Sequence, residues 1–182
     1  MDRVIIFALL ALTVVAVSRR TMFDVRSHGF YRMISWLCIA WLLAANCRVW
    51  FDYPFSVRQL FSWAFLIISV YLVVAGVIML KKTGKPQNTR DEKSLYNFER
   101  TTELIDRGIF RYIRHPLYSS LIFLTWGICF KNPAPELLLI SLLSTISLYL
   151  TAKFDEKECI AYFGNKYVEY VKKSKRFIPF VF

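Results

Sequence analysis

The segment from Leu60 to Leu80 constrains the fold most, because it runs for 21 residues without a charged side chain. A helix of about 20 apolar residues is long enough to cross the hydrocarbon core of a bilayer. The whole chain has the same character, since 56% of its residues are hydrophobic and its mean hydropathy is +0.40. Both values are too high for a soluble domain of 182 residues. The sequence therefore predicts an integral membrane protein.

Four further apolar runs are separated from this one by turns, basic residues or a long polar connection. We expect an all-α, integral membrane helical bundle of about five transmembrane helices, which forms a single membrane domain. The first run is short for a complete crossing. The predicted spans cover residues 4–18, 30–50, 60–80, 116–131 and 136–153.

Two polar regions complete the predicted architecture. Residues 81–115 form a long loop with a short helical turn at 101–105, and a loop of this length is often functional, so it could cover a site. Residues 154–173 are expected to form an amphipathic C-terminal helix. One face of this helix would carry Glu156, Ile160, Phe163, Tyr167 and Tyr170.

The basic residues give the bundle an orientation. With five spans, 20 of the 24 Lys and Arg residues fall on one side of the membrane. Cytoplasmic loops carry an excess of these residues, so this side is predicted to be cytoplasmic and the N-terminus to be outside or lumenal. The net charge of +11 could also indicate nucleic-acid binding, but the basic residues lie between apolar runs and form no separate domain. We therefore expect contacts with membrane lipids and none with nucleic acid.

The stretch from Gly108 to Ser120, which reads G-I-F-R-Y-I-R-H-P-L-Y-S-S, joins the polar loop to an apolar run. Pro116 suits the first position of a helix, with His115 just before it. A helix start presents unpaired N–H groups, and Arg111, Arg114 and His115 add donors in the same place. An anion-binding site is therefore predicted here. The same residues also suit an interfacial belt of basic and aromatic side chains.

Two acids at the end of the last predicted span are expected to face this helix start. The connection between the last two spans is short, so they should form an antiparallel hairpin that brings Asp155 and Glu156 close to His115. Acid and base would then suit a ligand that carries both charges. The alternative is a structural ion pair, in which Arg111 or Arg114 binds Glu156 and closes the hairpin.

The motif R-H-P-L-Y at 114–118, combined with an acidic pair before F-G-x-x-Y at 163–167, resembles the isoprenylcysteine carboxyl methyltransferase family and its phospholipid methyltransferase relatives. The resemblance covers Thr102–Pro179. It implies an S-adenosylmethionine-dependent methyltransferase that methylates the carboxylate of a lipidated, isoprenylcysteine-like acceptor by in-line displacement. It also implies that the cofactor binds at the cytoplasmic side and that the lipophilic acceptor enters from the bilayer.

Carried over by position, the resemblance gives a set of cofactor-binding residues. Arg114 and Glu156 are predicted to be catalytic, and Arg111 and Lys153 are predicted to bind the acceptor, because Arg114, Arg111 or Lys153 could hold its carboxylate. The cofactor carboxylate suits the helix start at His115, and its ammonium group suits Asp155 or Glu156. No metal is expected, because the four cysteines form no ligand pair and the chain has two histidines. The predicted cofactor-binding residues are Thr102, Glu103, Leu104, Ile105, Phe110, His115, Pro116, Leu117, Tyr118, Asp155 and Glu156.

The resemblance specifies the acceptor less well than the methyl donor. Thr151 stands where eukaryotic prenylcysteine enzymes of this family carry a substrate-binding arginine. An ionised carboxylate needs no general base, whereas an amine, as in phosphatidylethanolamine methylation, needs a proton acceptor such as Glu156, His115 or Tyr118. A small thiol is a third possible acceptor. Two other classes of function are also compatible with the sequence: a nicotinamide-dependent reductase of the sterol type, and a non-enzymatic protein that binds anionic lipid.

Overall fold

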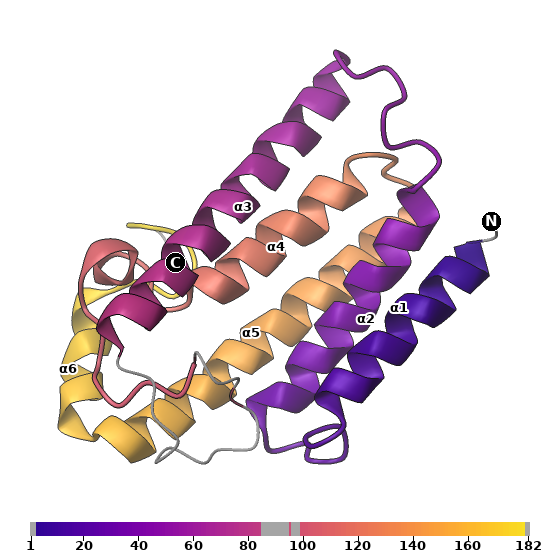
Figure 1. Cartoon of the computed structure of the whole chain (residues 1–182). Helices are drawn as coiled ribbons and strands as arrows, with labels where there is room; N and C mark the ends of the chain where they lie inside the picture. Colours follow the sequence, from indigo (N-terminus) through magenta and orange to yellow (C-terminus); the bar gives the residue numbers. More distant parts are fainter. Residues whose placement is uncertain (1–2, 85–94, 96–98, 181–182) are drawn as a thin grey trace.

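The computed structural model describes residues 3–84, 95 and 99–180, and within them the chain is all-helical (Figure 1). The described residues form six α-helices and one short 3-10 helix, with no strand among them, which confirms the predicted all-α class. The elements in chain order are α1 (Arg3–Ser18), α2 (His28–Asn46), α3 (Val57–Thr83), η1 (Gly108–Arg111), α4 (Pro116–Cys129), α5 (Pro135–Phe163) and α6 (Asn165–Lys173).

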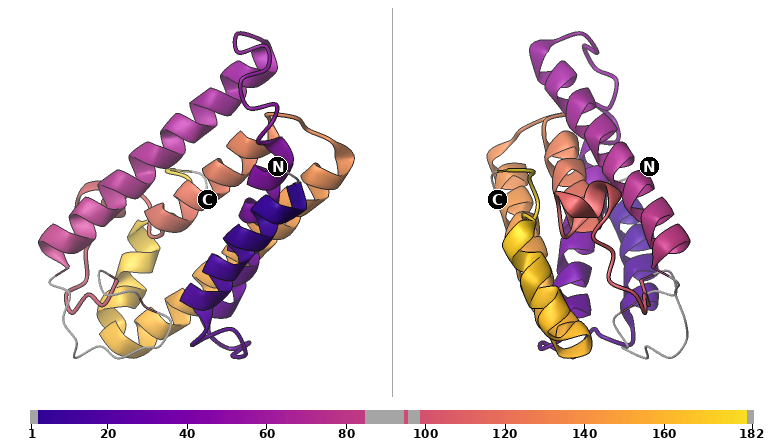
Figure 2. Two further views of the ribbon diagram at one scale, coloured as in Figure 1. Left: turned by 45° about the vertical axis from the view of Figure 1, so that its right-hand side comes forward. Right: turned by 90° about the vertical axis from the view of Figure 1, so that its left-hand side faces the viewer.

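The helices pack as a bundle in which α1 lies on α2, α2 lies on α5, and α3 lies on α4 (Figures 1 and 2). The centre of the core is formed where α2, α4 and α5 meet, and Leu42, Ile128 and Cys129 are fully buried there. Hydroxyl groups also join the helices, since Ser35 Oγ lies 2.8 Å from Ser144 Oγ. Small residues of this kind allow helices to approach closely in membranes.

Helices α3 and α5, with 27 and 29 residues, are the two described helices that are long and apolar enough to cross a membrane. Large apolar side chains of α3 point away from the bundle, and Ile67 and Tyr71 keep 67% and 66% of their surface exposed. An exposed apolar surface of this extent indicates contact with lipid. Helices α1 and α4 are shorter and also apolar, and the number of crossings stays a prediction.

The expected C-terminal helix is divided into two. Helix α5 continues without interruption past the predicted boundary at 153 and ends at Phe163. Gly164 follows with a φ of 61°, a conformation that ends a helix and that glycine adopts readily, and α6 starts afterwards. The five residues predicted on one face therefore do not share one helix. Ile160 is exposed, whereas Tyr167 and Tyr170 are buried.

The predicted loop starts later than expected, because α3 continues to Thr83. The loop was expected to cover a site, but part of it, residues 85–94 and 96–98, lies outside the described residues. The short helical turn predicted at 101–105 does not form. The backbone N–H of Thr102 instead donates a hydrogen bond of 3.1 Å to the carbonyl of Gly84, which ties this segment to the end of α3. The one described turn of helix in this loop is the 3-10 helix η1.

Candidate functional site

A pocket lies at the end of the bundle where α4 begins. Segment 99–105, the last turn of α3, η1, the first turn of α4, α5 and α6 all contribute to its wall. Most of the lining is apolar or aromatic, and its acidic and basic side chains are Glu99, Arg114, His115 and Asp155. The lining residues are Leu80, Leu95, Glu99, Thr101, Leu104, Ile105, Phe110, Arg114, His115, Pro116, Leu117, Tyr118, Asp155, Cys159, Phe163, Tyr167 and Tyr170.

The pocket is narrow, with a free volume of about 100 Å³, and a larger groove of about 1140 Å³ lies beside it. Leu104, Phe163 and Tyr170 line both, so these three residues form the wall between them. Sites for drug-sized ligands usually measure about 300–1,000 Å³. The free volume of the pocket alone is therefore below this range.

The predicted cofactor-binding residues divide between these two cavities. Thr102 and Glu103 line the groove but not the pocket. Glu156 lines neither cavity, because its carboxylate is turned toward the C-terminal segment. The pocket brings together Leu104, Ile105, Phe110, His115, Pro116, Leu117, Tyr118 and Asp155.

The start of α4 is built as its sequence predicts. His115 occupies the position before the helix, and Pro116 begins it. The carbonyl of His115 accepts hydrogen bonds from both the backbone N–H and the hydroxyl of Ser119, each of 2.9 Å. These bonds hold the backbone of His115 in place, and its side chain, which is only 6% exposed, turns toward α5.

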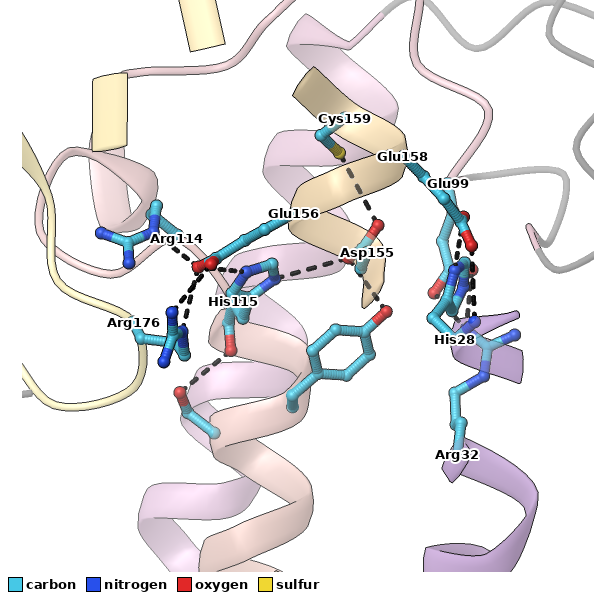
Figure 3. Close-up of polar contacts among 12 residues, drawn as sticks. His28, Arg32, Glu99, Arg114, His115, Asp155, Glu156, Glu158, Cys159 and Arg176 are labelled. Carbon is cyan, nitrogen blue, oxygen red and sulfur yellow. Dashed lines mark hydrogen bonds and ion pairs between the residues drawn. The ribbon is translucent and has the colours of Figure 1, made fainter. Parts of the chain in front are cut away.

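His115 lies between the two acids of α5 (Figure 3). Its Nδ1 is 3.4 Å from Oδ2 of Asp155, and its Nε2 is 3.3 Å from Oε1 of Glu156. Tyr118 donates its hydroxyl to the same Asp155 oxygen at 3.1 Å, and its ring stacks on the imidazole with centroids 5.3 Å apart. The short hairpin thus brings the predicted base and acids into direct contact, with Asp155 facing the pocket.

Glu156 forms the centre of an ion-pair cluster on the side away from the pocket. Arg114 donates from Nε to Oε1 of Glu156 at 3.0 Å, so the ion pair considered as the alternative from sequence is present. Arg176 binds both oxygens of the same carboxylate, at 3.0 and 2.8 Å. Arg114 also donates to the carbonyls of Val171 and Ser174. We call Arg114, His115, Tyr118, Asp155, Glu156 and Arg176 the His115 cluster.

The electrostatics of the cluster follow from these contacts, which lie beyond the predicted spans. Burial lowers the pKa of the His115 imidazole, but hydrogen bonds to Asp155 and Glu156 outweigh this effect and raise it above the ordinary value of 6.5. Burial raises the pKa of the Glu156 carboxyl, but His115 and Arg176 outweigh it and hold it well below 4.5. The contacts favour a charged imidazole between ionised carboxylates.

The two residues predicted to bind an acceptor lie elsewhere. Arg111 was expected to join Arg114 and His115, but it is exposed, and it lines the groove instead of the pocket. Arg111 is the last residue of the 3-10 helix η1, and its guanidinium lies 5.9 Å from the ring centroid of Tyr112. Lys153 is exposed on α5 and lines neither cavity. Neither residue is part of the His115 cluster.

Sequence analysis missed a second group of ion pairs beside Asp155. His28 Nδ1 lies 2.7 Å from Glu158 Oε2, and Arg32 Nη1 lies 3.0 Å from Glu99 Oε2 (Figure 3). These contacts connect the first turns of α2 to α5 and to the wall of the pocket. The basic residues near 26–32 had been interpreted only as a sign of membrane orientation. Pairing across more than 60 residues gives no signal in a single sequence.

Among the described residues, one group of three possible metal ligands comes together. Single ligand atoms of His28, Asp155 and Glu158 all lie within 4.8 Å of one another. Hydrogen bonds within the clusters already use these groups, since Glu158 accepts from His28 and Asp155 accepts from Tyr118. We therefore interpret them as an ion-pair network and assign no metal to them.

Comparison with known proteins identifies the family. The model of the phospholipid methyltransferase family matches residues 57–166, which is more than half of the chain. The chain belongs to this family. The family is part of the isoprenylcysteine carboxyl methyltransferase-like group, so the resemblance found in the sequence is confirmed. No curated protein and no solved structure matches the chain.

The matched region runs from the start of α3 into α6 and therefore includes His115, Asp155 and Glu156. It excludes α1, α2 and the C-terminal segment that carries Arg176. Membership indicates a membrane methyltransferase, and enzymes of this family generally use S-adenosylmethionine. The His115 cluster thus combines residues inside the matched region with one residue beyond it.

Proposed function

We propose that this protein is an integral membrane methyltransferase that transfers a methyl group from S-adenosylmethionine to a lipophilic acceptor. The observation that carries the proposal is the contact between His115 and Asp155 within a pocket of the matched region. It supplies a basic group and an acidic group side by side, next to apolar walls. A zwitterionic cofactor with an aromatic base needs this combination.

The residues present fit such a cofactor. Asp155 lines the pocket with an ionised carboxylate that would hold the ammonium group, and Arg114 and His115 would hold the carboxylate near the start of α4. Phe110, with apolar neighbours, would contact the purine. Glu156, which was predicted as both a catalytic and a cofactor-binding residue, would act indirectly by holding Arg114 and His115 in place.

The bound cofactor supplies an electrophilic methyl group on a sulfonium, which an acceptor displaces in line. The protein has three tasks in such a reaction. Asp155, His115 and Arg114 would orient the donor, and positioning of this kind contributes most of the rate enhancement in a displacement. The apolar wall, with Leu80 and Leu117, would exclude water from the reacting atoms. The narrow pocket limits the geometry of approach.

We also propose the topology predicted from the sequence, with five crossings, a cytoplasmic site and the N-terminus outside or lumenal. All polar segments that build the pocket lie at the basic side of the bundle. In this arrangement the cofactor would arrive from the cytoplasm and the acceptor would enter from the bilayer. Membrane lipids would surround α3, whose apolar side chains point outward.

Two acceptor classes fit the proposal, and the charges near the pocket favour one of them. An isoprenylcysteine-like carboxylate would need a cation, and of the predicted Arg111, Arg114 and Lys153 only Arg114 lines the pocket, already bound to Glu156. Asp155, assigned to the cofactor ammonium group, and Glu99, which binds Arg32, both line the pocket, so a lipid amine would be attracted by the negative charge that they add there and not by an unpaired carboxylate. We therefore favour the lipid amine.

An amine acceptor must lose a proton before it attacks the methyl group. His115 lines the pocket, but its contacts with Asp155 and Glu156 favour the charged imidazole, which cannot accept a proton, so only the neutral form present as pH rises above its raised pKa would serve as the base. In that form the proton would move from the ammonium group to the imidazole and later to solvent. A carboxylate acceptor, which is already ionised, would not require this step.

Titration calorimetry of the detergent-purified protein with S-adenosylhomocysteine tests the donor site. We expect saturable binding with one site, and a loss of at least tenfold in affinity for the His115→Ala variant, because a charge-assisted contact contributes about 1.5–3 kcal/mol. NADPH serves as the comparison ligand for the reductase alternative. Absence of S-adenosylhomocysteine binding by the unmodified protein would overturn the proposal.

Labelled methyl transfer identifies the acceptor. Vesicles that contain phosphatidylethanolamine, and separately a prenylcysteine, are incubated with the protein and labelled S-adenosylmethionine. We expect label in the lipid extract, stable to base, because an N-methyl bond resists the hydrolysis that cleaves a methyl ester. Base-labile label in the prenylcysteine would identify the carboxylate acceptor instead.

A further inference from the structure

The C-terminal segment, residues 174–177, is bound along the chain just before α4. The backbone N–H of Arg114 donates to the carbonyl of Lys175 at 2.7 Å, and that of His115 donates to the carbonyl of Arg176 at 3.2 Å. The N–H of Lys175 returns a bond of 3.0 Å to Tyr112. The two bonds of Lys175 make an isolated parallel β-bridge between Ile113 and Lys175.

The segment is also fixed from the α4 side and by packing. The Ser119 hydroxyl shares its one proton between the carbonyls of His115 and Phe177, each at 2.9 Å, and the Phe177 ring centroid lies 6.4 Å from that of the His115 imidazole. Phe177 is buried, with 5% of its surface exposed. The backbone around Arg176 therefore has little freedom, so the direction of its side chain is determined by the fold.

Arg176 uses this fixed position to bind Glu156 with two parallel contacts. Its Nε lies 3.0 Å from Oε1 and its Nη2 lies 2.8 Å from Oε2, an arrangement in which the planar guanidinium matches the carboxylate (Figure 3). The guanidinium also lies 5.1 Å from the ring centroid of Tyr149 on α5. Arg176 itself does not line the pocket.

We propose that Arg176 is a positioning residue for the cofactor site, which holds Glu156 against His115 and thereby sets the charge and orientation of the imidazole that faces Asp155. The inference rests on the proposed function. It extends beyond the family resemblance, because Arg176 lies outside the matched region.

The contacts explain why a second arginine is needed. A single carboxylate, Glu156, accepts from Arg114, Arg176 and His115. Without Arg176, one positive charge is lost, and Glu156 would interact more strongly with the imidazole. The pKa of His115 would then rise, and the ring would be drawn toward Glu156 and away from Asp155. The consequence for the pocket is a displaced Asp155 and a weaker hold on the ligand.

Two measurements on the full-length protein in detergent test the proposal. Titration calorimetry gives the affinity for S-adenosylhomocysteine, and NMR of protein with labelled histidine gives the titration of each imidazole. The chain contains two histidines, so the His28→Gln variant assigns both signals. The variants compared are Arg176→Ala, Arg176→Lys and, as a matched control, Lys175→Ala. Lys175 is exposed and contributes its backbone to the same bridge.

For Arg176→Ala we expect about tenfold weaker S-adenosylhomocysteine binding and a higher pKa of His115, in keeping with the loss of one charge-assisted contact. Arg176→Lys retains the charge but loses the paired contact, so we expect a smaller loss of about threefold. Lys175→Ala should match the unmodified protein in both measurements. Rescue by lysine and movement of the His115 signal distinguish positioning from a role in stability alone.

Unchanged affinity and an unchanged His115 titration in the Arg176 variants would overturn the inference. If Arg176→Ala does not fold, as judged by its elution profile, Arg176→Lys is compared with Lys175→Ala instead. Equal affinity and equal His115 titration in these two variants would then overturn the inference. Failure of the unmodified protein to bind S-adenosylhomocysteine would instead overturn the proposed function. The two failures are therefore distinguishable.

Discussion

Two clusters of buried polar side chains lie at opposite ends of the α4–α5 hairpin, and they differ in what borders them. At the hairpin loop, Lys131 donates to Gln59 at 2.8 Å and lies 3.3 Å above the ring of Trp63 and 5.0 Å from that of Trp50. Lys131 and Gln59 are both fully buried. We call Lys131, Gln59, Trp50 and Trp63 the Lys131 cluster. Gln59 also donates to the backbone carbonyl of Asp52 at 2.9 Å.

The His115 cluster at the other end is also buried, but one of its sides forms the wall of a pocket. It contains more charges, and they come from the start of α4, from α5 and from the C-terminal segment. Burial of polar groups is therefore compatible with either a structural or a binding role. A neighbouring cavity, with a charged group turned into it, indicates the binding role.

Neutralising Asp155 should give the largest difference in ligand binding between the His115 cluster and the Lys131 cluster. For Asp155→Asn we expect S-adenosylhomocysteine binding to weaken by about 30-fold, equivalent to about 2 kcal/mol, because the ligand ammonium loses a charge-assisted partner. Titration calorimetry measures the change. Equal affinity in the variant and the unmodified protein would show that Asp155 does not hold the ligand.

Changes of pH between 4 and 9 should act on the His115 cluster through its imidazole and its carboxylates. The raised pKa of His115 contributes stability that is complete below 6.5 and is lost as pH rises through the folded-state pKa. The lowered pKa of Glu156 contributes stability that is complete above 4.5 and is lost as pH falls. The contribution of the cluster is therefore largest between these two values.

Thermal unfolding between pH 4 and 9 provides the measurement. Each group changes the free energy of unfolding by at most about 1.4 kcal/mol per pH unit. In His115→Gln the decline on the alkaline side should become smaller, with the remainder due to His28, where burial lowers the pKa but the contact with Glu158 outweighs this effect and raises it. The decline on the acid side should also become smaller, because His115 helps to lower the pKa of Glu156. Identical alkaline declines in both proteins would contradict the assignment to His115.

A substitution in the Lys131 cluster should reduce stability and leave binding unchanged. Lys131→Met removes the hydrogen bond to Gln59 and the contact with Trp63, although it also relieves the desolvation of a buried charge. We expect a net loss of about 1 kcal/mol in the free energy of unfolding. S-adenosylhomocysteine affinity, measured below the melting temperature, should stay within twofold. A loss of binding similar to that of Asp155→Asn would show that the two clusters are coupled.

The smallest effects are expected at the two exposed cations. Arg111→Ala and Lys153→Ala should each change the rate of methyl transfer by less than about twofold, because exposed charges interact weakly at physiological salt. Labelled methyl transfer to a lipid amine gives the rate. A decrease of tenfold or more would show that one of them binds an acceptor, as the sequence predicted, and would favour a carboxylate acceptor.

Much of the framework could be predicted because it depends on local signals. Long apolar runs defined the helices, and Pro116 marked the start of α4. The short loop after α4 required an antiparallel hairpin, which is why the proximity of His115 to Asp155 and Glu156 could be expected. These features depend only on the spacing of apolar residues and on the positions of prolines and short turns.

Other parts depended on distant contacts or on the detailed course of the backbone. Arg176 belonged to a tail of basic and aromatic residues, which is typical of a membrane interface, and its partner Glu156 lies 20 residues earlier. Gly164 divides the predicted C-terminal helix, yet a lone glycine is tolerated inside many helices. Arg111 lines the groove instead of the pocket and belongs to a single 3-10 turn before α4, and no sequence pattern specified that turn.

The length of α5 has a consequence for where the chemistry takes place. A helix rises about 1.5 Å per residue, so the 29 residues of α5 extend for about 43 Å, whereas the hydrocarbon core measures about 30 Å. If Pro135 lies at the outer edge of that core, as the proposed topology requires, Asp155 comes about 30 Å further along, at the inner edge. A lipid headgroup would meet this carboxylate without leaving its leaflet, and a water-soluble donor would meet it without entering the hydrocarbon.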